Sequence, residues 1–312
     1  LTADGRAKSY DGKQWRAFGT SEGMAPGSRF ILAANDQFVW AIGDNLNLTE
    51  EGLRRWEDHN LFAGVPAGSS VTDVAADTQG RVWLAFAGPS EHLTGGLASY
   101  DPQTGRWLGY RQSYNPIIPG QIYDLDVDGQ GTLWVAGDGG LAYRQPDGPW
   151  EALPIDGLVV RSFCRDDQGR FWLGTDHGLW STKPDGSDLQ GPWLIPSPLV
   201  GNQVTCLATD GQQRLWIGTT RGTSYVAGSG NTGVTMTEPA LHMAAAPDGS
   251  IWLATTTGLY HLNQDQAPER VLEYVVAAMT IDAQGTLWVC TSDGQLRKWS
   301  GAAWETMAQV VQ

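Results

Sequence analysis

The stretch DDQGRFWLGTDHGLW, residues 166–180, decides the fold of this chain because close copies of it recur along the sequence. Related segments are DTQGRVWLA at 77–85, DGQGTLWVA at 128–136 and DAQGTLWVC at 282–290. Self-similarity at a fixed period indicates one supersecondary unit that is repeated as an array. The copies are marked by seven tryptophans at intervals of 36 to 51 residues: Trp40, Trp83, Trp134, Trp172, Trp216, Trp252 and Trp288.

Each copy reads as four short β-strands. In residues 70–112 the runs SVTDVAAD, RVWLAF, GLASYD and RWLGYRQ are separated by turn residues, and none has helical periodicity. In the first turn an Asp lies six residues before the Trp and can accept hydrogen bonds from the turn backbone. A Gly three residues before the Trp can supply the positive φ that a tight hairpin requires.

One four-stranded sheet cannot bury its own two faces, whereas copies arranged radially cover one another. The repeats therefore predict an all-β fold, a seven-bladed β-propeller of four-stranded antiparallel blades in one domain, residues 1–312. The repeated Trp is expected to pack between adjacent blades. We expect residues 6–18 to form an N-terminal outer hairpin involved in ring closure, with both termini in one blade. The predicted blades span residues 29–62, 70–112, 121–153, 158–195, 202–236, 240–272 and 275–307.

The composition argues against several classes of partner. The chain has 34 Asp and Glu against 20 Lys and Arg, a formal net charge of −14, which would repel a phosphate backbone. No apolar run approaches the roughly 18 residues of a membrane span. We therefore expect no nucleic-acid partner and no membrane insertion of these residues.

Three segments carry a resemblance to a known family: DDQGRFWLGTDHGLW at 166–180, DGQQRLWIGTTRGTSY at 210–225 and APDGSIWLATTTGLYHL at 246–262. They resemble the two-component regulator propeller repeat, and the resemblance extends over about residues 29–307. It implies the periplasmic or extracellular sensor region of a bacterial hybrid histidine kinase, often tied to carbohydrate sensing, or a free-standing relative.

The blades are also similar, at the level of the fold, to those of streptogramin lyases. In that family a Glu often follows the Trp, and acid and histidine residues hold magnesium. This chain has Thr or Gly in the comparable places, including Thr175, Thr219, Thr255 and Thr291, and its histidines form no H-x-E-x-H-like group. The resemblance therefore does not extend to lyase activity.

Departures from the period are the first signal of function. The first two repeats carry insertions, GDNLNLTEE and AGPSEHLTG, between the second and third strands, and QSYNPIIPG links the second blade to the third. Loops on a rigid scaffold commonly carry binding residues, so Glu91, His92 and Tyr114 are candidates on this loop-rich face. Neutral variation in loop length is the alternative.

The second signal is a set of polar residues on the first strands, which should line the central channel. Asp73, Asp124 and His242 lie ten residues before their Trp, and Asp126 shares a strand face with Asp124. These four residues could hold a calcium or magnesium ion or form an acid/base set, and Arg161 could pair with the carboxylates. Alternatively, they hydrogen-bond the backbone around a water-filled channel.

We therefore expect a non-enzymatic propeller that binds a carbohydrate, another small molecule or a protein on its loop-rich face, without a cofactor. The sequence contains no GxSxG, HExxH or P-loop pattern, so the case for an enzyme lacks a nucleophile and a convincing base. The alternatives are a metal-dependent lyase or hydrolase with its site in the channel, or a protein–protein interaction scaffold.

Overall fold

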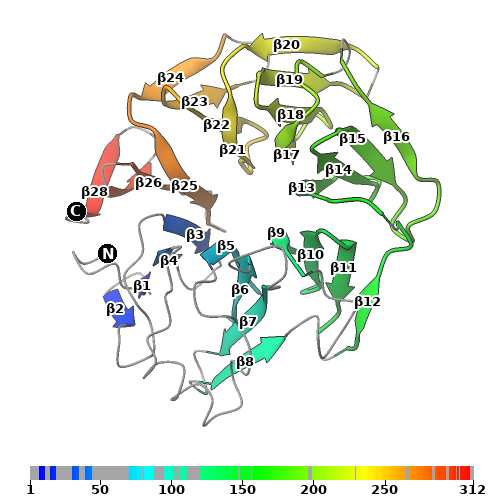
Figure 1. Ribbon diagram of the computed structural model, residues 1–312. Coiled ribbons are helices and arrows are strands. Elements are labelled where there is room, and N and C mark those ends of the chain that lie inside the picture. The colour runs from blue at the N-terminus through cyan, green and yellow to red at the C-terminus, as the bar shows by residue number, and fades with distance from the viewer. Residues whose placement is uncertain are drawn as a thin grey trace.

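Four-stranded antiparallel sheets are arranged in a ring around a central axis (Figure 1). The computed structural model describes residues 7–10, 15–18, 30–34, 39–43, 70–77, 79, 81–87, 95–101, 104, 106–110 and 120–309, the last range without 147, 156, 196–198, 229, 264–266, 283–284, 293–294, 300 and 302. All the elements assigned in this part of the chain are β-strands.

Six blades are each built from four strands that follow one another in the chain, with the first strand innermost. The first two blades consist of β5 (Ser70–Ala76), β6 (Val82–Ala87), β7 (Gly96–Asp101) and β8 (Arg106–Tyr110), then β9 (Ile122–Val127), β10 (Leu133–Gly137), β11 (Gly140–Arg144) and β12 (Trp150–Ala152). The next two consist of β13 (Ser162–Arg165), β14 (Phe171–Thr175), β15 (Gly178–Thr182) and β16 (Gln190–Trp193), then β17 (Val204–Thr209), β18 (Leu215–Thr219), β19 (Gly222–Val226) and β20 (Thr232–Met236). The last two consist of β21 (Ala240–Ala245), β22 (Ile251–Thr255), β23 (Leu259–Leu262) and β24 (Glu269–Leu272), then β25 (Val276–Ile281), β26 (Leu287–Thr291), β27 (Gln295–Trp299) and β28 (Trp304–Gln309).

The prediction of seven such blades is wrong, because among the described residues only six sheets are built this way. The first repeat contributes β3 (Phe30–Ala34) and β4 (Val39–Gly43), and the hairpin of β1 (Ala7–Tyr10) and β2 (Trp15–Phe18) pairs with them from the N-terminal side. The resulting sheet has the strand order β2-β1-β4-β3 and lies between β25 and β5 in the ring.

The expected placement of the termini is corrected by the same pairings. Strand β1 pairs with β4, with Ser9 opposite Trp40, whereas the C-terminal strand β28 pairs with β27 of the last blade. The two ends of the chain therefore belong to neighbouring sheets and do not share one blade. The last repeat already contains its own outer hairpin, β27 and β28.

The turn between the first two strands explains the repeated Asp and Trp. In the blade β13–β16, Asp166 Oδ1 accepts hydrogen bonds from the backbone N–H groups of Gln168 and Arg170, at 3.1 and 2.9 Å. Its Oδ2 accepts a bond from Trp172 Nε1 at 3.1 Å. The same carboxylate-to-indole bond occurs in four other blades, at Asp77–Trp83, Asp128–Trp134, Asp210–Trp216 and Asp282–Trp288.

The Trp residues pack between adjacent blades, as predicted. Trp134 on β10 contacts Phe171 on β14 of the next blade, with ring centroids 4.5 Å apart. Trp216 and Trp252 belong to apolar clusters that likewise include residues of the following blade. Burying these large rings between sheets supplies much of the apolar contact that holds the ring of blades together.

Gln213 occupies the turn position that is glycine in most repeats. The glycines three residues before the Trp have positive φ, for example 78° at Gly169, and Gln213 adopts the same conformation with φ of 62°. A side chain with a Cβ is strained in this region. Gln213→Gly is therefore expected to stabilise the protein by about 0.5–1 kcal/mol, measured by denaturant-induced unfolding.

The matched control for this prediction is Gly169→Ala, which adds a Cβ at the corresponding turn of the neighbouring blade. The new Cβ would lie 3.5 Å from Pro184, so space is adequate and only the backbone conformation is strained. The free energy of unfolding should fall by about 1 kcal/mol. If both variants shifted stability in the same direction, the explanation from backbone conformation would be incorrect.

Candidate functional site

The innermost strands enclose a central channel. The cavity has a volume of about 580 Å³ and is lined by residues of β5, β9, β13, β17, β21 and β25. Its wall includes each of the predicted channel residues Asp73, Asp124, Asp126, Arg161 and His242. The position ten residues before the Trp thus identified Asp73, Asp124 and His242 as residues of the channel wall.

Asp73 and Asp124 tie three consecutive blades together. Asp73 Oδ2 accepts a hydrogen bond from the backbone N–H of Leu125, in the next blade, at 2.6 Å, and Oδ1 accepts one from Val74 N–H at 2.8 Å. Asp124 Oδ2 accepts a bond from Phe163 N–H of the following blade at 2.8 Å. The two carboxyl groups are close enough for each to influence the pKa of the other.

The surroundings of this carboxyl pair favour its neutral form. Burial is the main cause that raises the pKa of Asp73 to about 7, although its backbone hydrogen bonds act in the opposite direction. Burial, followed by the charge of Asp73, raises the pKa of Asp124 well above its ordinary value.

The metal centre predicted from Asp73, Asp124, Asp126 and His242 does not assemble. Among the described residues, which include all four, no group of three His, Cys, Asp or Glu side chains is arranged to hold a metal ion. Asp126 and His242 are exposed to the channel, while the surrounding protein raises the pKa of Asp126 and lowers that of His242 by desolvation.

Arg161 does not pair with the channel carboxylates. Its Nε and Nη2 donate to Asp176 Oδ2 at 3.0 and 2.7 Å, and Asp176 Oδ1 accepts a bond from Gln203 Nε2 at 3.1 Å. The guanidinium lies over the ring of Tyr123, 4.0 Å from its centroid. Burial by itself lowers the pKa of Arg161, but the hydrogen bonds and charges of Asp176 and Tyr123 together outweigh it and raise the pKa.

These four residues, here called the Arg161 cluster, lie at one end of the channel wall. Arg161 directly precedes β13, Gln203 directly precedes β17, and Asp176 lies in the turn between β14 and β15. This end carries the links between blades, as shown by the bonds from Gly178 N–H to Asn202 and from Thr220 N–H to Gln203. We call it the link face. The cluster is partly exposed there, Arg161 by 35% and Asp176 by 28% of their side chains.

Nothing in the sequence distinguishes Tyr123, Asp176 and Gln203 as site residues, since each is ordinary for its place in the repeat. The predicted binding residues Glu91, His92 and Tyr114 lie outside the described residues, so their roles stay predictions.

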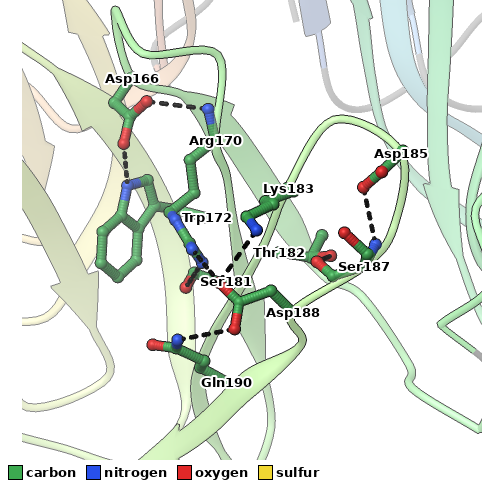
Figure 2. A network of polar contacts seen from close by, with 10 residues as sticks. All are labelled: Asp166, Arg170, Trp172, Ser181, Thr182, Lys183, Asp185, Ser187, Asp188 and Gln190. Atoms are coloured by element: carbon green, nitrogen blue, oxygen red, sulfur yellow. Dashed lines mark hydrogen bonds and ion pairs between the residues drawn. The ribbon is translucent and has the colours of Figure 1, made fainter.

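A second polar network lies away from the channel, in the blade β13–β16 (Figure 2). Arg170 Nη2 donates to Asp188 Oδ2 at 2.7 Å and Nη1 donates to Ser181 Oγ at 2.8 Å. Gln190 Nε2 donates to the other Asp188 oxygen at 3.0 Å. This bond holds the segment that leads into the outermost strand, β16. This network holds the blade's outer strands together and resembles the Arg161 cluster only in its Arg–Asp geometry.

Two stretches, residues 154–177 and 198–221, match the family model described as two component regulator propeller. These two stretches are similar to two component regulator propeller repeats. The resemblance predicted from the sequence is thus confirmed. The matched stretches lead into β13 and β17 and extend through β14 and β18, so they contain two copies of the turn and Trp described above.

Solved structures share the propeller fold at low sequence identity. The extracellular domain of a hybrid two component system from B. thetaiotaomicron is 17% identical with a TM-score of 0.66; the match covers 92% of this chain but only 42% of that one. A catalytically inactive virginiamycin B lyase from Staphylococcus aureus with quinupristin is 13% identical with a TM-score of 0.61, covering 76% of this chain and 84% of the lyase. YCF48 bound to D1 peptide is 14% identical with a TM-score of 0.57, covering 80% and 84%.

No curated protein sequence matches this chain. In the part of the chain that the structure describes, no helix has the length and apolar character needed to cross a membrane.

Proposed function

We propose that this chain is a non-enzymatic ligand-binding propeller that acts as the extracytoplasmic sensor region of a bacterial two-component signalling protein, or as a free-standing relative. The propeller repeats at 154–177 and 198–221 support this role. So does the similarity of the fold to the extracellular domain of a hybrid two component system. The ligand would be a carbohydrate fragment or another small polar molecule.

The Arg161 cluster is the observation that carries the proposal. It joins three blades at the edge of the channel, with the guanidinium held by two hydrogen bonds to one carboxylate oxygen. A group fixed in this way loses little conformational freedom when a ligand binds, which favours affinity. The Tyr123 ring, the Asp176 carboxylate and the Gln203 amide offer an aromatic surface, an acceptor and a polar amide to a hydroxyl-rich ligand.

The first test is binding to a panel of oligosaccharides by thermal shift and calorimetry. A ligand that binds only the folded protein must raise its Tm. We expect Arg161→Lys and Tyr123→Leu each to weaken binding by about tenfold, because they remove the bidentate guanidinium and the aromatic surface.

Arg170→Lys is the matched control, since Arg170 forms an Arg–Asp pair of the same 2.7 Å length outside the channel. The affinity of the Arg170→Lys variant for the oligosaccharide should equal that of the wild type. Unchanged affinity in the Arg161 and Tyr123 variants would contradict a site at this cluster. Attention would then move to the predicted loop residues Glu91, His92 and Tyr114.

A panel without any binding oligosaccharide would contradict the carbohydrate assignment. In that case pull-down with the purified propeller would test for a protein partner on the link face. The metal-dependent lyase or hydrolase is tested separately, by elemental analysis of the purified protein. Stoichiometric calcium or magnesium, together with turnover that a chelator abolishes, would favour the enzyme.

A further inference from the structure

We propose that the channel binds an amphipathic small molecule, whose hydroxyl-rich head lies at the Arg161 cluster and whose short aliphatic chain lies against the opposite wall, on β21 and β25. This inference rests on the proposed function for the head. It adds the aliphatic chain and the surface that receives it. The supporting observation is the division of polar and apolar side chains around the channel.

The polar side chains of the channel wall are concentrated on three consecutive strands. The first strands follow one another around the channel in the order β5, β9, β13, β17, β21 and β25 (Figure 1). Asp73 lies on β5, Asp124 and Asp126 lie on β9, and Arg161 and Ser162 lie at the start of β13. The strands β21 and β25 are separated from this polar group by β17 on one side and by β3 on the other. They therefore form the opposite side of the channel.

Apolar side chains on β21 and β25 line that opposite side and are not buried. Residues two apart on a strand share a side, and four residues of strand, as from 241 to 245, correspond to about 13 Å of wall. None of these residues is buried, whereas every residue of β22 and β26, the second strands of the same blades, is buried. We call this part of the channel wall the apolar arc: Leu241, Met243, Ala245, Ala277, Met279 and Ile281.

The composition of the apolar arc suits an aliphatic chain. The strands β21 and β25 read ALHMAA and VAAMTI and contain no Phe, Tyr or Trp on which a flat ring could stack. The flexible thioethers of Met243 and Met279 can adapt to an irregular chain, and the short alanines leave room for it. Covering these side chains with a ligand removes apolar surface from water, which favours binding. The cavity volume of about 580 Å³ lies within the range of small-molecule sites.

Methyl and butyl β-glucoside are the probes, because they share one head and differ by three methylenes in the aliphatic chain. A fully buried methylene contributes about a fourfold gain in affinity. The arc covers the chain from one side, so we expect the Kd of butyl glucoside in calorimetric titration to be about tenfold lower than that of methyl glucoside. Butyl glucoside should also raise the Tm more at equal concentration. Equal affinities, or no binding of butyl glucoside, would overturn the proposal.

NMR of isotope-labelled methionine methyl groups locates the chain in the wild-type protein. Butyl glucoside should shift the methyl signals of Met243 and Met279, and methyl glucoside should shift them much less. Met236 is the internal control, because it belongs to the outermost strand β20 and is not part of the channel wall. Unchanged signals of Met243 and Met279 in the presence of bound butyl glucoside would show that the chain binds elsewhere and would overturn the proposal.

Met279→Gln tests the apolar arc by placing a polar amide of similar length in it. This variant should weaken the binding of butyl glucoside about fivefold more than that of methyl glucoside. Met236→Gln is the matched control, because it makes the same substitution outside the channel, and it should bind both probes as the wild type does. Equal effects of Met279→Gln on the two probes would contradict the proposal. If Met279→Gln fails to fold, the methionine signals of the wild type decide alone.

Arg161→Lys tests the head separately, since it should weaken the binding of both probes by the same factor. If Met279→Gln discriminates between the probes but Arg161→Lys changes neither affinity, the aliphatic chain binds on the apolar arc and the proposed site of the head is wrong. If Arg161→Lys weakens both probes equally and Met279→Gln weakens neither, the proposed function stands and the apolar arc does not bind the ligand.

Discussion

Replacing Asp210 with alanine is expected to lower the free energy of unfolding by about 3–5 kcal/mol, measured by denaturant-induced unfolding. Asp210 Oδ2 accepts hydrogen bonds from Arg214 Nε at 2.6 Å and from Trp216 Nε1 at 2.8 Å. Oδ1 accepts the backbone N–H groups of Gln212 and Arg214, both at 2.9 Å. The substitution leaves the Arg214 charge buried without the carboxylate that faces it, and the turn loses its acceptors.

The control is Asp188→Ala, which removes a carboxylate from an arginine at nearly the same distance. The Arg170–Asp188 pair is 2.7 Å long, but Asp188 is 38% exposed, whereas the Asp210 side chain is fully buried. Water solvates both charges of the exposed pair, so its loss should change stability far less. Equal losses in the two variants would show that burial does not decide the strength of these pairs.

The repeat predicted the turns well because their chemistry is local. The Asp, the Gly and the Trp lie within seven residues, and the hydrogen bonds that Asp166 accepts all come from inside one hairpin. The spacing of six residues also brings the carboxylate to the indole N–H of the Trp. From the sequence, the Asp was expected to bind only the turn backbone. Local spacing fixes a short loop's geometry and leaves little to tertiary context.

The first sheet could not be predicted in the same way, because its strands meet across the sequence. Lys8 on β1 lies opposite Ala41 on β4, with the whole of β2 and β3 between them in the chain. Nothing in a hydrophobic pattern states which of two hairpins will share an edge. The seven repeats counted in the sequence are therefore real, but only six of the described sheets are built from four consecutive strands.

For the channel, the sequence located the residues but not their partners. The period placed Asp73 and Asp124 on the channel wall, yet their backbone partners Leu125 and Phe163 lie 52 and 39 residues away. Arg161 likewise pairs with Asp176, which lies fifteen residues further along the chain. Such contacts depend on how one blade is rotated against the next, which no local motif encodes.

The blade β21–β24 shows that a departure from the repeat can have a structural role and no functional one. Ala246 replaces the turn Asp, and Trp252 stacks on His261 with ring centroids 4.3 Å apart, as Trp134 stacks on Tyr143 in a blade that keeps the Asp. His261 Nε2 lies 2.8 Å from Ser250 Oγ, which donates to Asp248 at 2.6 Å. Ser250 lies between His261 and Asp248 in this row of contacts and is buried. The three side chains therefore replace the missing turn contacts and do not form a nucleophile–base arrangement.

Gly222→Ala is expected to lower the free energy of unfolding by about 3 kcal/mol, again measured by denaturant-induced unfolding. Gly222 begins β19 with φ of 144°, a conformation that residues with a Cβ rarely adopt. An added Cβ would lie 2.3 Å from the carbonyl oxygen of Met236 and 3.0 Å from Thr237 Cα. Both obstacles are backbone atoms, so relief requires the end of β20 to move away from β19.

Gly228→Ala is the matched control for this variant, because the same methyl group is added two residues beyond the end of the same strand. There an added Cβ meets no atom within 4 Å. Its stability should equal or slightly exceed that of the wild type, since alanine restricts the unfolded chain more than glycine does. If Gly222→Ala and Gly228→Ala had the same free energy of unfolding, the close approach of β20 to the start of β19 would not be a constraint on the blade. A selective loss at Gly222 would explain why glycine recurs six residues after the Trp at Gly140, Gly178 and Gly258, where φ is also positive.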